Sequence, residues 1–166
     1  MRVGIGYDVH RFGGRGPLRL GGITIPGARG LAGHSDADVL LHAVTDALLG
    51  AVGAPDIGEQ FPSEDPRYRD AESARFVRVA VDLMRRRGWA VANLDATVIA
   101  DAPRLIGYKV QMRRAISRLL GIAAAQVSVK AKTTEAFCPR AAGIAAQAIV
   151  LLRPVRRPGR GKRKGT

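Results

Sequence analysis

The 166-residue chain contains a single cysteine, Cys138, and few aromatic residues, which make up 5% of the sequence. One cysteine excludes an internal disulfide and a zinc cluster built from cysteines alone, and a lone thiol fits a reducing compartment. The chain has no run of 18 apolar residues, because Asp38, His42 and Asp46 interrupt its most apolar stretch, 37–55. The first residues also lack the apolar core of a signal peptide. We therefore expect a cytoplasmic protein that does not span a membrane.

The composition, with 46% hydrophobic and 25% charged residues, is close to the average for globular proteins. The length favours a single domain with its own hydrophobic core. The formal net charge is +13, and residues 153–166 hold seven basic side chains and no acidic one. We expect residues 1–152 to form the domain and residues 153–166 to be a disordered basic tail, which attracts polyanions without selecting one.

Strand and helix patterns alternate along the domain. This alternation favours an α+β fold, in which one mixed sheet is covered by helices on one face. The apolar periodicity and the positions of glycine and proline predict an initial strand at 3–12, a turn at 13–17, a hairpin of 18–20 and 23–25, an irregular loop at 56–70, helices after Ser35 and at 72–87 and 108–120, and strands at 89–100, 127–133 and 144–152.

The segment Ser35-Asp36-Ala37-Asp38 matches a capping box, with Ser35 as the helix N-cap. The free amides of a helix N-terminus attract anions, so a phosphate could dock beside His34 and Ser35. Capping alone explains Ser35 equally well. The Gly4-x-Gly6 pair is not a dinucleotide fingerprint, because no third glycine and no helix start follow it.

Metal-ligating residues are concentrated near the N-terminus, where all three histidines lie. Asp8 and His10 are two residues apart on an expected strand, so both side chains point to the same face. His42 on the first helix can complete an Asp/His/His set, which leaves one zinc position open for substrate. Asp46, one helical turn further on, could orient His42, although a solvent-exposed neighbour is the commoner case.

A second polar cluster, Lys132-Thr133-Thr134-Glu135, follows an expected strand. Glu135 is the only acidic residue after Asp101. A cation, two hydroxyls and a carboxylate suit a phosphate together with a hard divalent ion. An ordinary polar turn at a strand end is an equally good interpretation.

Several segments together resemble one family, that of 2-C-methyl-D-erythritol 2,4-cyclodiphosphate synthase, over 2–152 and with nearly the same spacing. The segments that carry the resemblance are Gly6-Tyr7-Asp8-Val9-His10, Gly33-His34-Ser35-Asp36-Ala37-Asp38, Leu41-His42-Ala43, Thr45-Asp46-Ala47-Leu48-Leu49-Gly50, Asp56-Ile57-Gly58, Phe61-Pro62 and Val129-Lys130-Ala131 through Glu135. The basic tail lies outside this similarity.

The resemblance implies an enzyme of the non-mevalonate isoprenoid pathway, a phosphorus-oxygen lyase. Such an enzyme converts 4-diphosphocytidyl-2-C-methyl-D-erythritol 2-phosphate to 2-C-methyl-D-erythritol 2,4-cyclodiphosphate and releases CMP. It also implies a homotrimer whose sheets face the three-fold axis and whose active sites lie between neighbouring subunits. The substrate's own 2-phosphate is the nucleophile in this reaction, so catalysis consists of positioning and charge neutralisation.

Residue roles follow from the same resemblance. Asp8, His10 and His42 match zinc ligands, and Glu135 matches the ligand of a second ion, Mg²⁺ or Mn²⁺. His34 and Thr133 match the catalytic residues that position the reacting phosphates. The remaining matches are substrate contacts: Ser35, Asp56, Gly58, Phe61, Pro62, Ser63, Glu64, Asp65, Ala100, Asp101, Ala102, Pro103, Arg104, Leu105, Ile106, Lys132, Thr134, Phe137 and Arg140.

The chain departs from the family pattern at Asp101, where members commonly have Gln, and at Ala142, where many have Glu. The first departure adds a negative charge beside the expected nucleotide pocket.

Two other function classes fit the residues alone. A metal-dependent phosphoesterase would use the same ligands with water as nucleophile. A basic nucleic-acid-binding protein would act through the tail, but few aromatics are present to stack on bases.

Overall fold

The computed structural model describes residues 1–135 and 142–155. Five strands form one mixed sheet in the order β2-β1-β5-β3-β4. The pair β3/β4 is parallel, and the pairs β1/β2, β1/β5 and β3/β5 are antiparallel. The strands are β1 (Arg2–Leu20), β2 (Ile23–Leu31), β3 (Trp89–Ile99), β4 (Val127–Lys132) and β5 (Gly143–Pro154).

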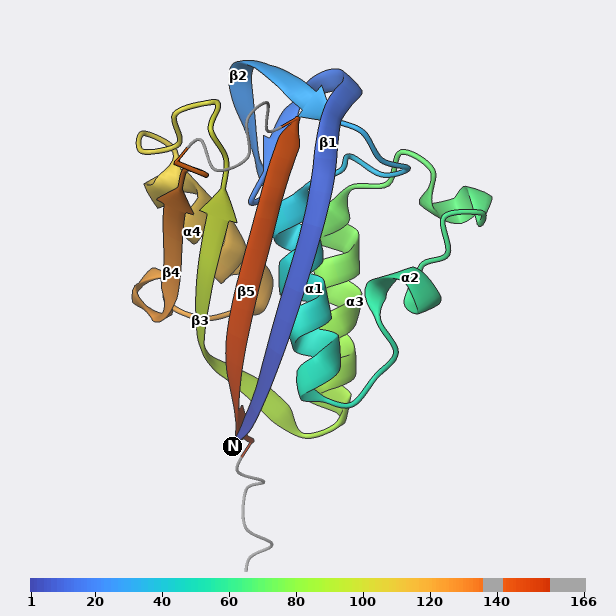
Figure 1. The fold of residues 1–166 in the computed structure, drawn as a ribbon. Helices are drawn as coiled ribbons and strands as arrows, with labels where there is room; N and C mark the ends of the chain where they lie inside the picture. Colours follow the sequence, from blue (N-terminus) through green and yellow to red (C-terminus); the bar gives the residue numbers. More distant parts are fainter. Residues whose placement is uncertain (136–141, 156–166) are drawn as a thin grey trace, which may run out of the picture.

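Three helices pack against one face of this sheet and leave the other face open (Figure 1). They are α1 (Val39–Ala51), α3 (Ser73–Arg86) and α4 (Lys109–Leu120). The mixed sheet with helices on one face agrees with the fold expected from the sequence. In the described ranges, no helix has the length and apolar character needed to cross a membrane.

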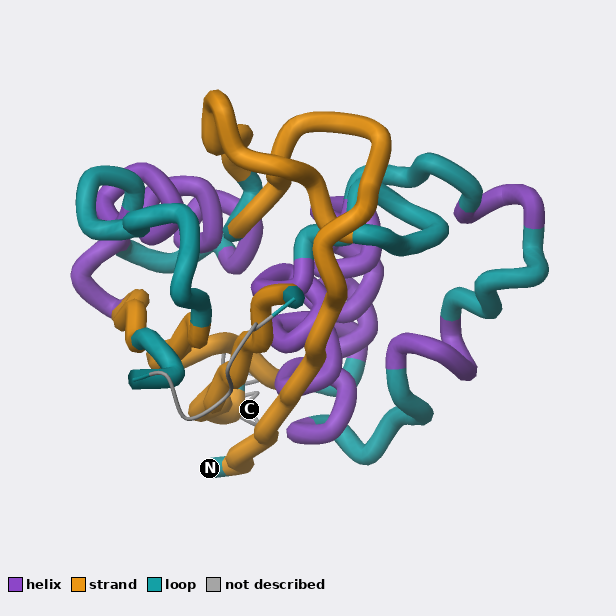
Figure 2. Tube along the Cα trace, turned by 45° about the horizontal axis from the view of Figure 1, so that its top comes forward, coloured by secondary structure: helices purple, strands orange, loops and turns teal. Residues whose placement is uncertain are grey.

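The connection between α1 and α3 extends away from the sheet and helices in both overall views (Figure 2). It contains the short helix α2 (Ile57–Gln60) and the 3₁₀ turn η1 (Pro66–Tyr68), and a second 3₁₀ turn, η2 (Ala124–Gln126), precedes β4. The irregular loop expected at 56–70 is thus partly helical. Asp56 and Asp65 start its two helical turns by accepting hydrogen bonds from the amides of Glu59 and Arg67, each at 2.9 Å.

Two glycines of β1 allow α1 to lie directly against the strand. A Cβ at Gly4 would stand 1.9 Å from the Ala47 carbonyl oxygen, and one at Gly6 would stand 2.0 Å from that of Ala43. Real side chains never approach backbone so closely, so only glycine fits here. The Gly4-x-Gly6 pair therefore brings the helix to the strand, which places His42 beside the side chains of β1.

The turn expected at 13–17 is not present, because β1 continues through this segment to Leu20. The strand pairs with β5 over residues 2–11 and with β2 over residues 12–20, and the register shifts at Pro17. A β-bulge accommodates the glycines and the proline of segment 13–17, where the strand changes its pairing partner from β5 to β2. The hairpin expected after it is correct, because Leu20 pairs with Ile23.

The C-terminal strand β5 continues to Pro154, two residues beyond the expected end of the domain, and Arg153 pairs with Ala90 of β3. Most of the expected tail, 156–166, lies outside the described residues.

Helix α1 begins three residues later than expected and is capped by Asp38 instead of Ser35. The fully buried Asp38 carboxylate accepts hydrogen bonds from the amides of Leu41, Gly21 and Gly22 at 3.0, 2.8 and 2.7 Å. Burial raises the pKa of Asp38, although the three amides oppose the shift. Asp38 therefore fixes the start of α1 against the β1–β2 turn, and Ser35 is left available on the preceding segment.

Candidate metal centre and phosphate pockets

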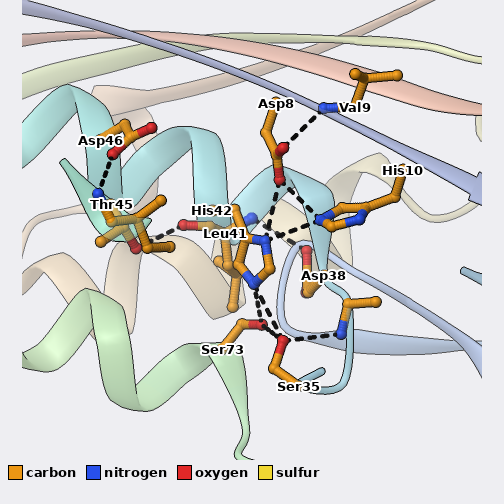
Figure 3. Close-up of polar contacts among 12 residues, drawn as sticks. Asp8, Val9, His10, Ser35, Asp38, Leu41, His42, Thr45, Asp46 and Ser73 are labelled. Carbon is orange, nitrogen blue, oxygen red and sulfur yellow. Dashed lines mark hydrogen bonds and ion pairs between the residues drawn. The ribbon is translucent and has the colours of Figure 1, made fainter. Parts of the chain in front are cut away.

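Asp8 and His10 of β1 meet His42 of α1 on the helix-covered side of the sheet (Figure 3). His42 Nδ1 lies 3.0 Å from Asp8 Oδ2 and 3.0 Å from His10 Nε2, and His10 Nε2 lies 2.9 Å from Asp8 Oδ2. The side chains of Asp8, His10 and His42 are 26%, 20% and 12% exposed. Three ligand atoms thus converge in a largely buried position that is still open to solvent.

This donor set fits a zinc ion. Ligands held about 2.0 Å from zinc at tetrahedral angles are roughly 3.3 Å apart, so the three atoms need to separate by only a few tenths of an ångström. One carboxylate and two imidazoles are typical zinc ligands, and three protein ligands leave the fourth position open. The sequence-based grouping of Asp8, His10 and His42 is therefore supported by the geometry.

The contacts within the triad also shift the pKa values of Asp8 and His10. Burial disfavours ionisation of Asp8, but hydrogen bonds with His10 and His42 outweigh it and hold the pKa of the carboxyl well below its usual range. The hydrogen bond to Asp8 raises the pKa of His10, against the opposing effect of burial. An ionised Asp8 is the form that coordinates a cation.

Behind the triad, His42 is held by Ser35, which the sequence analysis assigned to the substrate, and by Ser73, to which it assigned no role. His42 Nε2 lies 2.9 Å from the hydroxyl of Ser73 and 3.2 Å from that of Ser35. The fully buried Ser73 donates in turn to Asp36 Oδ1 at 2.5 Å. When a cation replaces the Nδ1–H that faces Asp8, a neutral His42 keeps its Nε2–H donated to Ser73 and presents an unprotonated Nδ1 to the ion. The sequence analysis placed Asp36 in the supposed capping box and in a segment that resembles the family, but gave it no role of its own.

We expect the substitution Ser73→Ala to weaken zinc binding by about ten- to a hundredfold, because His42 then loses the acceptor that fixes its tautomer and orientation. A chelator competition titration of the purified protein measures the affinity. Ser128→Ala, which removes an exposed hydroxyl of β4, is the control. Equal affinities of Ser73→Ala and the wild type would show that Ser73 does not orient the ligand.

The metal triad lines a pocket of about 260 Å³ below the extended connection between α1 and α3. His34, Ser35, Gly58, Phe61 and Ser63 from the expected set also line it. Two aromatic residues that the sequence analysis did not select complete the wall: Phe76 stacks on Phe61 at 4.6 Å between ring centroids, and Tyr68 packs edge-on to Phe61 at 5.4 Å. The pocket thus combines ligand atoms with an aromatic wall.

Asp46 does not orient His42. Its Oδ1 accepts a hydrogen bond from the amide of Ile57 at 2.8 Å, and burial raises the pKa of its carboxyl. Asp46 therefore attaches the start of α2 to α1 and holds the wall of the metal pocket in place.

A second pocket, of about 380 Å³, lies where β3 and the edge strand β4 end. Residues from the expected nucleotide segment and from the turn expected to bind phosphate line it together: Ala100, Asp101, Pro103, Arg104, Leu105, Ile106, Lys132 and Thr133. The Asp101 carboxylate accepts hydrogen bonds from the Thr134 amide and hydroxyl at 2.7 and 2.8 Å. This departure from the family pattern thus links the two halves of the pocket.

Glu135 follows directly on this turn and accepts a hydrogen bond from the hydroxyl of Thr133. Its φ of 52° is unusual for a residue other than glycine. The Thr133 hydroxyl and the exposed Glu135 carboxylate therefore lie together beside the second pocket.

The two pockets are separated within one chain. Asp8 pairs with Ala146 of β5, Ala146 pairs with Val98 of β3, and Val98 pairs with Ala131 of β4. Three strand spacings of about 4.8 Å therefore put roughly 14 Å of sheet between Asp8 and the strand that carries the second cluster. The structure groups the expected site residues into two sets but does not bring Glu135 to the metal triad.

The other expected contacts lie outside both linings. Asp56 and Asp65 make the capping contacts described above, and Glu64 is exposed. The set outside the two linings comprises Asp56, Pro62, Glu64, Asp65, Ala102, Thr134 and Glu135. Phe137 and Arg140 lie outside the described residues, as does Cys138.

The chain is similar to known proteins over most of its length. It is 53% identical over 154 residues to 2-C-methyl-D-erythritol 2,4-cyclodiphosphate synthase of Geobacillus kaustophilus (strain HTA426), covering 92% of this chain and 98% of the relative. It is 54% identical, also over 154 residues, to the protein of the same name from Moorella thermoacetica (strain ATCC 39073 / JCM 9320), covering 92% of this chain and 94% of the relative.

Solved structures share the fold. The bifunctional IspDF from Campylobacter jejuni superposes with a TM-score of 0.87 at 40% identity, covering 92% of this chain, which spans 42% of that protein. A 2C-methyl-D-erythritol-2,4-cyclodiphosphate synthase in its CDP-bound form superposes with a TM-score of 0.85 at 38% identity and covers 92% of this chain and 100% of its own. The family model described as the YgbB family matches residues 1–153, and the chain therefore belongs to this family.

Proposed function

We propose that the chain is a metal-dependent 2-C-methyl-D-erythritol 2,4-cyclodiphosphate synthase. It converts 4-diphosphocytidyl-2-C-methyl-D-erythritol 2-phosphate to the cyclic diphosphate and releases CMP, as a lyase of the non-mevalonate isoprenoid pathway. The observation that carries this proposal is the convergence of Asp8, His10 and His42 in an open pocket, in a chain that matches its family over residues 1–153. The names of its relatives support the same activity.

The substrate carries its own nucleophile. Its 2-phosphate oxygen forms a bond to the β-phosphorus of the diphosphate, and the bond from that phosphorus to the oxygen of CMP breaks. Zinc at Asp8, His10 and His42, and Mg²⁺ or Mn²⁺ at Glu135, would supply positive charge that neutralises the phosphates. The protein groups hold the reacting atoms in line, and this positioning is the main part of catalysis for phosphoryl transfer.

The remaining site residues bind the parts of the substrate. His34 and Ser35 line the metal pocket and position a phosphate there. Asp56, Gly58 and residues 61–65 hold the methylerythritol part. Residues 100–106 hold the cytidine, and Lys132 and Thr133 bind its phosphates at the neighbouring strand end.

The open face of the sheet supports assembly of the chain as a homotrimer. The outward residues of β1, Val3, Ile5, Tyr7 and Val9, are 65%, 60%, 58% and 58% exposed, and Ile149 on the adjacent β5 is 44% exposed. A contiguous apolar stripe of this kind marks a protein interface. Three copies whose sheets face a common three-fold axis bury this stripe.

Trimer formation also explains why the site is divided. In one chain the metal pocket lies at β1 and the nucleotide pocket lies at the ends of β3 and β4. Three strand spacings, about 14 Å, separate β1 from β4. Around a three-fold axis, the metal pocket of one subunit faces the nucleotide pocket of its neighbour. Each active site then takes Asp8, His10 and His42 from one subunit and Thr133 and Glu135 from the next.

The substrate is a small molecule, and we place the enzyme in the cytoplasm. Nucleic-acid contact through the basic tail is not the function in this proposal.

Product analysis by mass spectrometry tests the activity with zinc and Mg²⁺ present. Cyclic diphosphate and CMP in equal amounts support the synthase. An uncyclised phosphate product would instead identify a metal-dependent phosphoesterase, and no turnover with tail-dependent RNA binding would identify a nucleic-acid-binding protein.

A further inference from the structure

We propose that a groove between α3 and α4 binds a condensed phosphate chain such as tripolyphosphate. The groove has a volume of about 500 Å³ and is separate from the linings of the metal and nucleotide pockets. Four arginines from three elements line it: Arg19 of β1, Arg78 and Arg85 of α3, and Arg118 of α4. This inference does not depend on the proposed synthase activity.

The positive charge of the groove is only partly neutralised by protein groups. The two carboxylates of the lining are Asp36 and Glu72. Asp36 already accepts hydrogen bonds from the amide and hydroxyl of Ser73 at 3.1 and 2.5 Å, and its other oxygen lies 3.7 Å from Nε of Arg19. The carboxylate of Glu72 is therefore left to balance the three other arginines.

These three arginines have no fixed partner. Within residues 1–135 and 142–155, Arg78, Arg85 and Arg118 form no ion pair, and their guanidinium groups donate no hydrogen bond. Guanidinium groups remain charged at any physiological pH, so their mutual repulsion persists until an anion enters. The planar donors of several arginines suit phosphate oxygens, which accept two parallel hydrogen bonds from one guanidinium.

The spacing of the arginines selects an extended anion. Arg78 and Arg85 are seven residues apart on α3, which corresponds to about 10.5 Å along the helix axis. A chain of linked phosphates spans more of this distance than a single orthophosphate does, so it reaches both guanidiniums with less bending of the arginine side chains. The described lining contains no aromatic side chain on which a nucleotide base could stack. The groove is therefore expected to recognise the phosphate chain itself.

Calorimetric titration with sodium tripolyphosphate at low ionic strength tests this inference. We expect Arg78→Gln and Arg118→Gln each to weaken binding by about tenfold, the effect of losing a charge-assisted hydrogen bond. Arg86→Gln and Arg114→Gln, which change exposed arginines of the same two helices outside the lining, should bind within about twofold of the wild type. Orthophosphate should bind at least about tenfold more weakly than tripolyphosphate, because it reaches fewer guanidiniums.

The same titration in a His42→Ala background removes phosphate bound at the metal centre, and the arginine effects should persist there. Unchanged affinity in both Arg78→Gln and Arg118→Gln would overturn the proposal, because the anion would then bind elsewhere. Equal affinities for orthophosphate and tripolyphosphate would contradict recognition of a chain. ATP that binds more tightly than tripolyphosphate, and that is weakened by both Arg78→Gln and Arg118→Gln, would contradict recognition of phosphate alone and assign the groove to a nucleotide, because neither arginine lines the second pocket.

Discussion

The substitution His42→Ala is expected to reduce bound zinc from one ion per chain to almost none and to lower turnover by at least about a thousandfold. The reason is that the proposed zinc site has three protein ligands, and two would not hold the ion against solvent. A loss of several kcal/mol of charge stabilisation in the transition state corresponds to this decrease in rate. Elemental analysis of the dialysed protein measures the zinc, and a CMP-release assay measures turnover.

His34→Ala is the matched control for this experiment. His34 is an exposed histidine of the same pocket and takes no part in the hydrogen bonds and ion pairs that join Asp8, His10 and His42. This variant should keep its zinc and lose turnover, because it changes phosphate positioning only. Stoichiometric zinc in His42→Ala would contradict the ligand assignment, and zinc loss in His34→Ala would show that the triad is not the complete protein ligand set.

The substitution Ile5→Asp is expected to convert a trimer to monomers and to lower turnover by more than about a hundredfold while zinc stays bound. Ile5 is 60% exposed in the single chain and lies beside Ile149 of β5 on the open face. Three carboxylates brought to one axis would lose their hydration and repel one another, which costs more than the buried apolar area contributes. Light scattering after size-exclusion chromatography measures the molar mass.

Val110→Asp provides the control, because Val110 is 51% exposed on α4, away from the open sheet face. This variant should keep the mass and turnover of the wild type. A trimeric Ile5→Asp protein would show that the outward residues of β1 are not the interface. A monomeric Ile5→Asp protein with full turnover would show that one chain contains a complete site.

The grouping of Asp8, His10 and His42 could be predicted only in part from local periodicity. Asp8 and His10 share a face by the period of two of a strand, whereas His42 joins them on condition that the first helix packs over this strand, and the zinc-ligand roles came from the family resemblance. The structure shows how this packing arises, because the absence of a side chain at Gly4 and Gly6 allows α1 to lie directly against β1. The overall class of fold followed from the same alternation of strands and helices.

Contacts between distant segments could not be predicted in this way. Asp36 and Ser73 are 37 residues apart and meet because α3 starts beside the turn that precedes α1. Asp38 was read as part of a capping box, whereas its burial against Gly21 and Gly22 makes it the cap itself. The division of the site into two pockets depends on strand order, which local patterns do not contain.

The role of Asp101 shows what a departure from a family pattern can and cannot indicate. The sequence marked the added charge beside the expected nucleotide pocket, but not the contact that it makes. In the structure, Asp101 accepts two hydrogen bonds from Thr134 and so fixes the turn between Thr133 and Glu135. The partner of a new carboxylate depends on a strand end 33 residues away.

In the proposed trimer each active site is shared by two subunits, and mixing two inactive variants tests this sharing directly. His42→Ala removes a metal ligand, and Glu135→Gln removes the carboxylate beside the nucleotide pocket, so each variant alone should have almost no turnover. When the two are unfolded together in equal amounts and refolded, about a quarter of all sites should combine an intact half from each variant. We predict recovery of roughly a quarter of wild-type turnover. No recovery from a mixture that contains mixed trimers by native mass spectrometry would contradict the shared site.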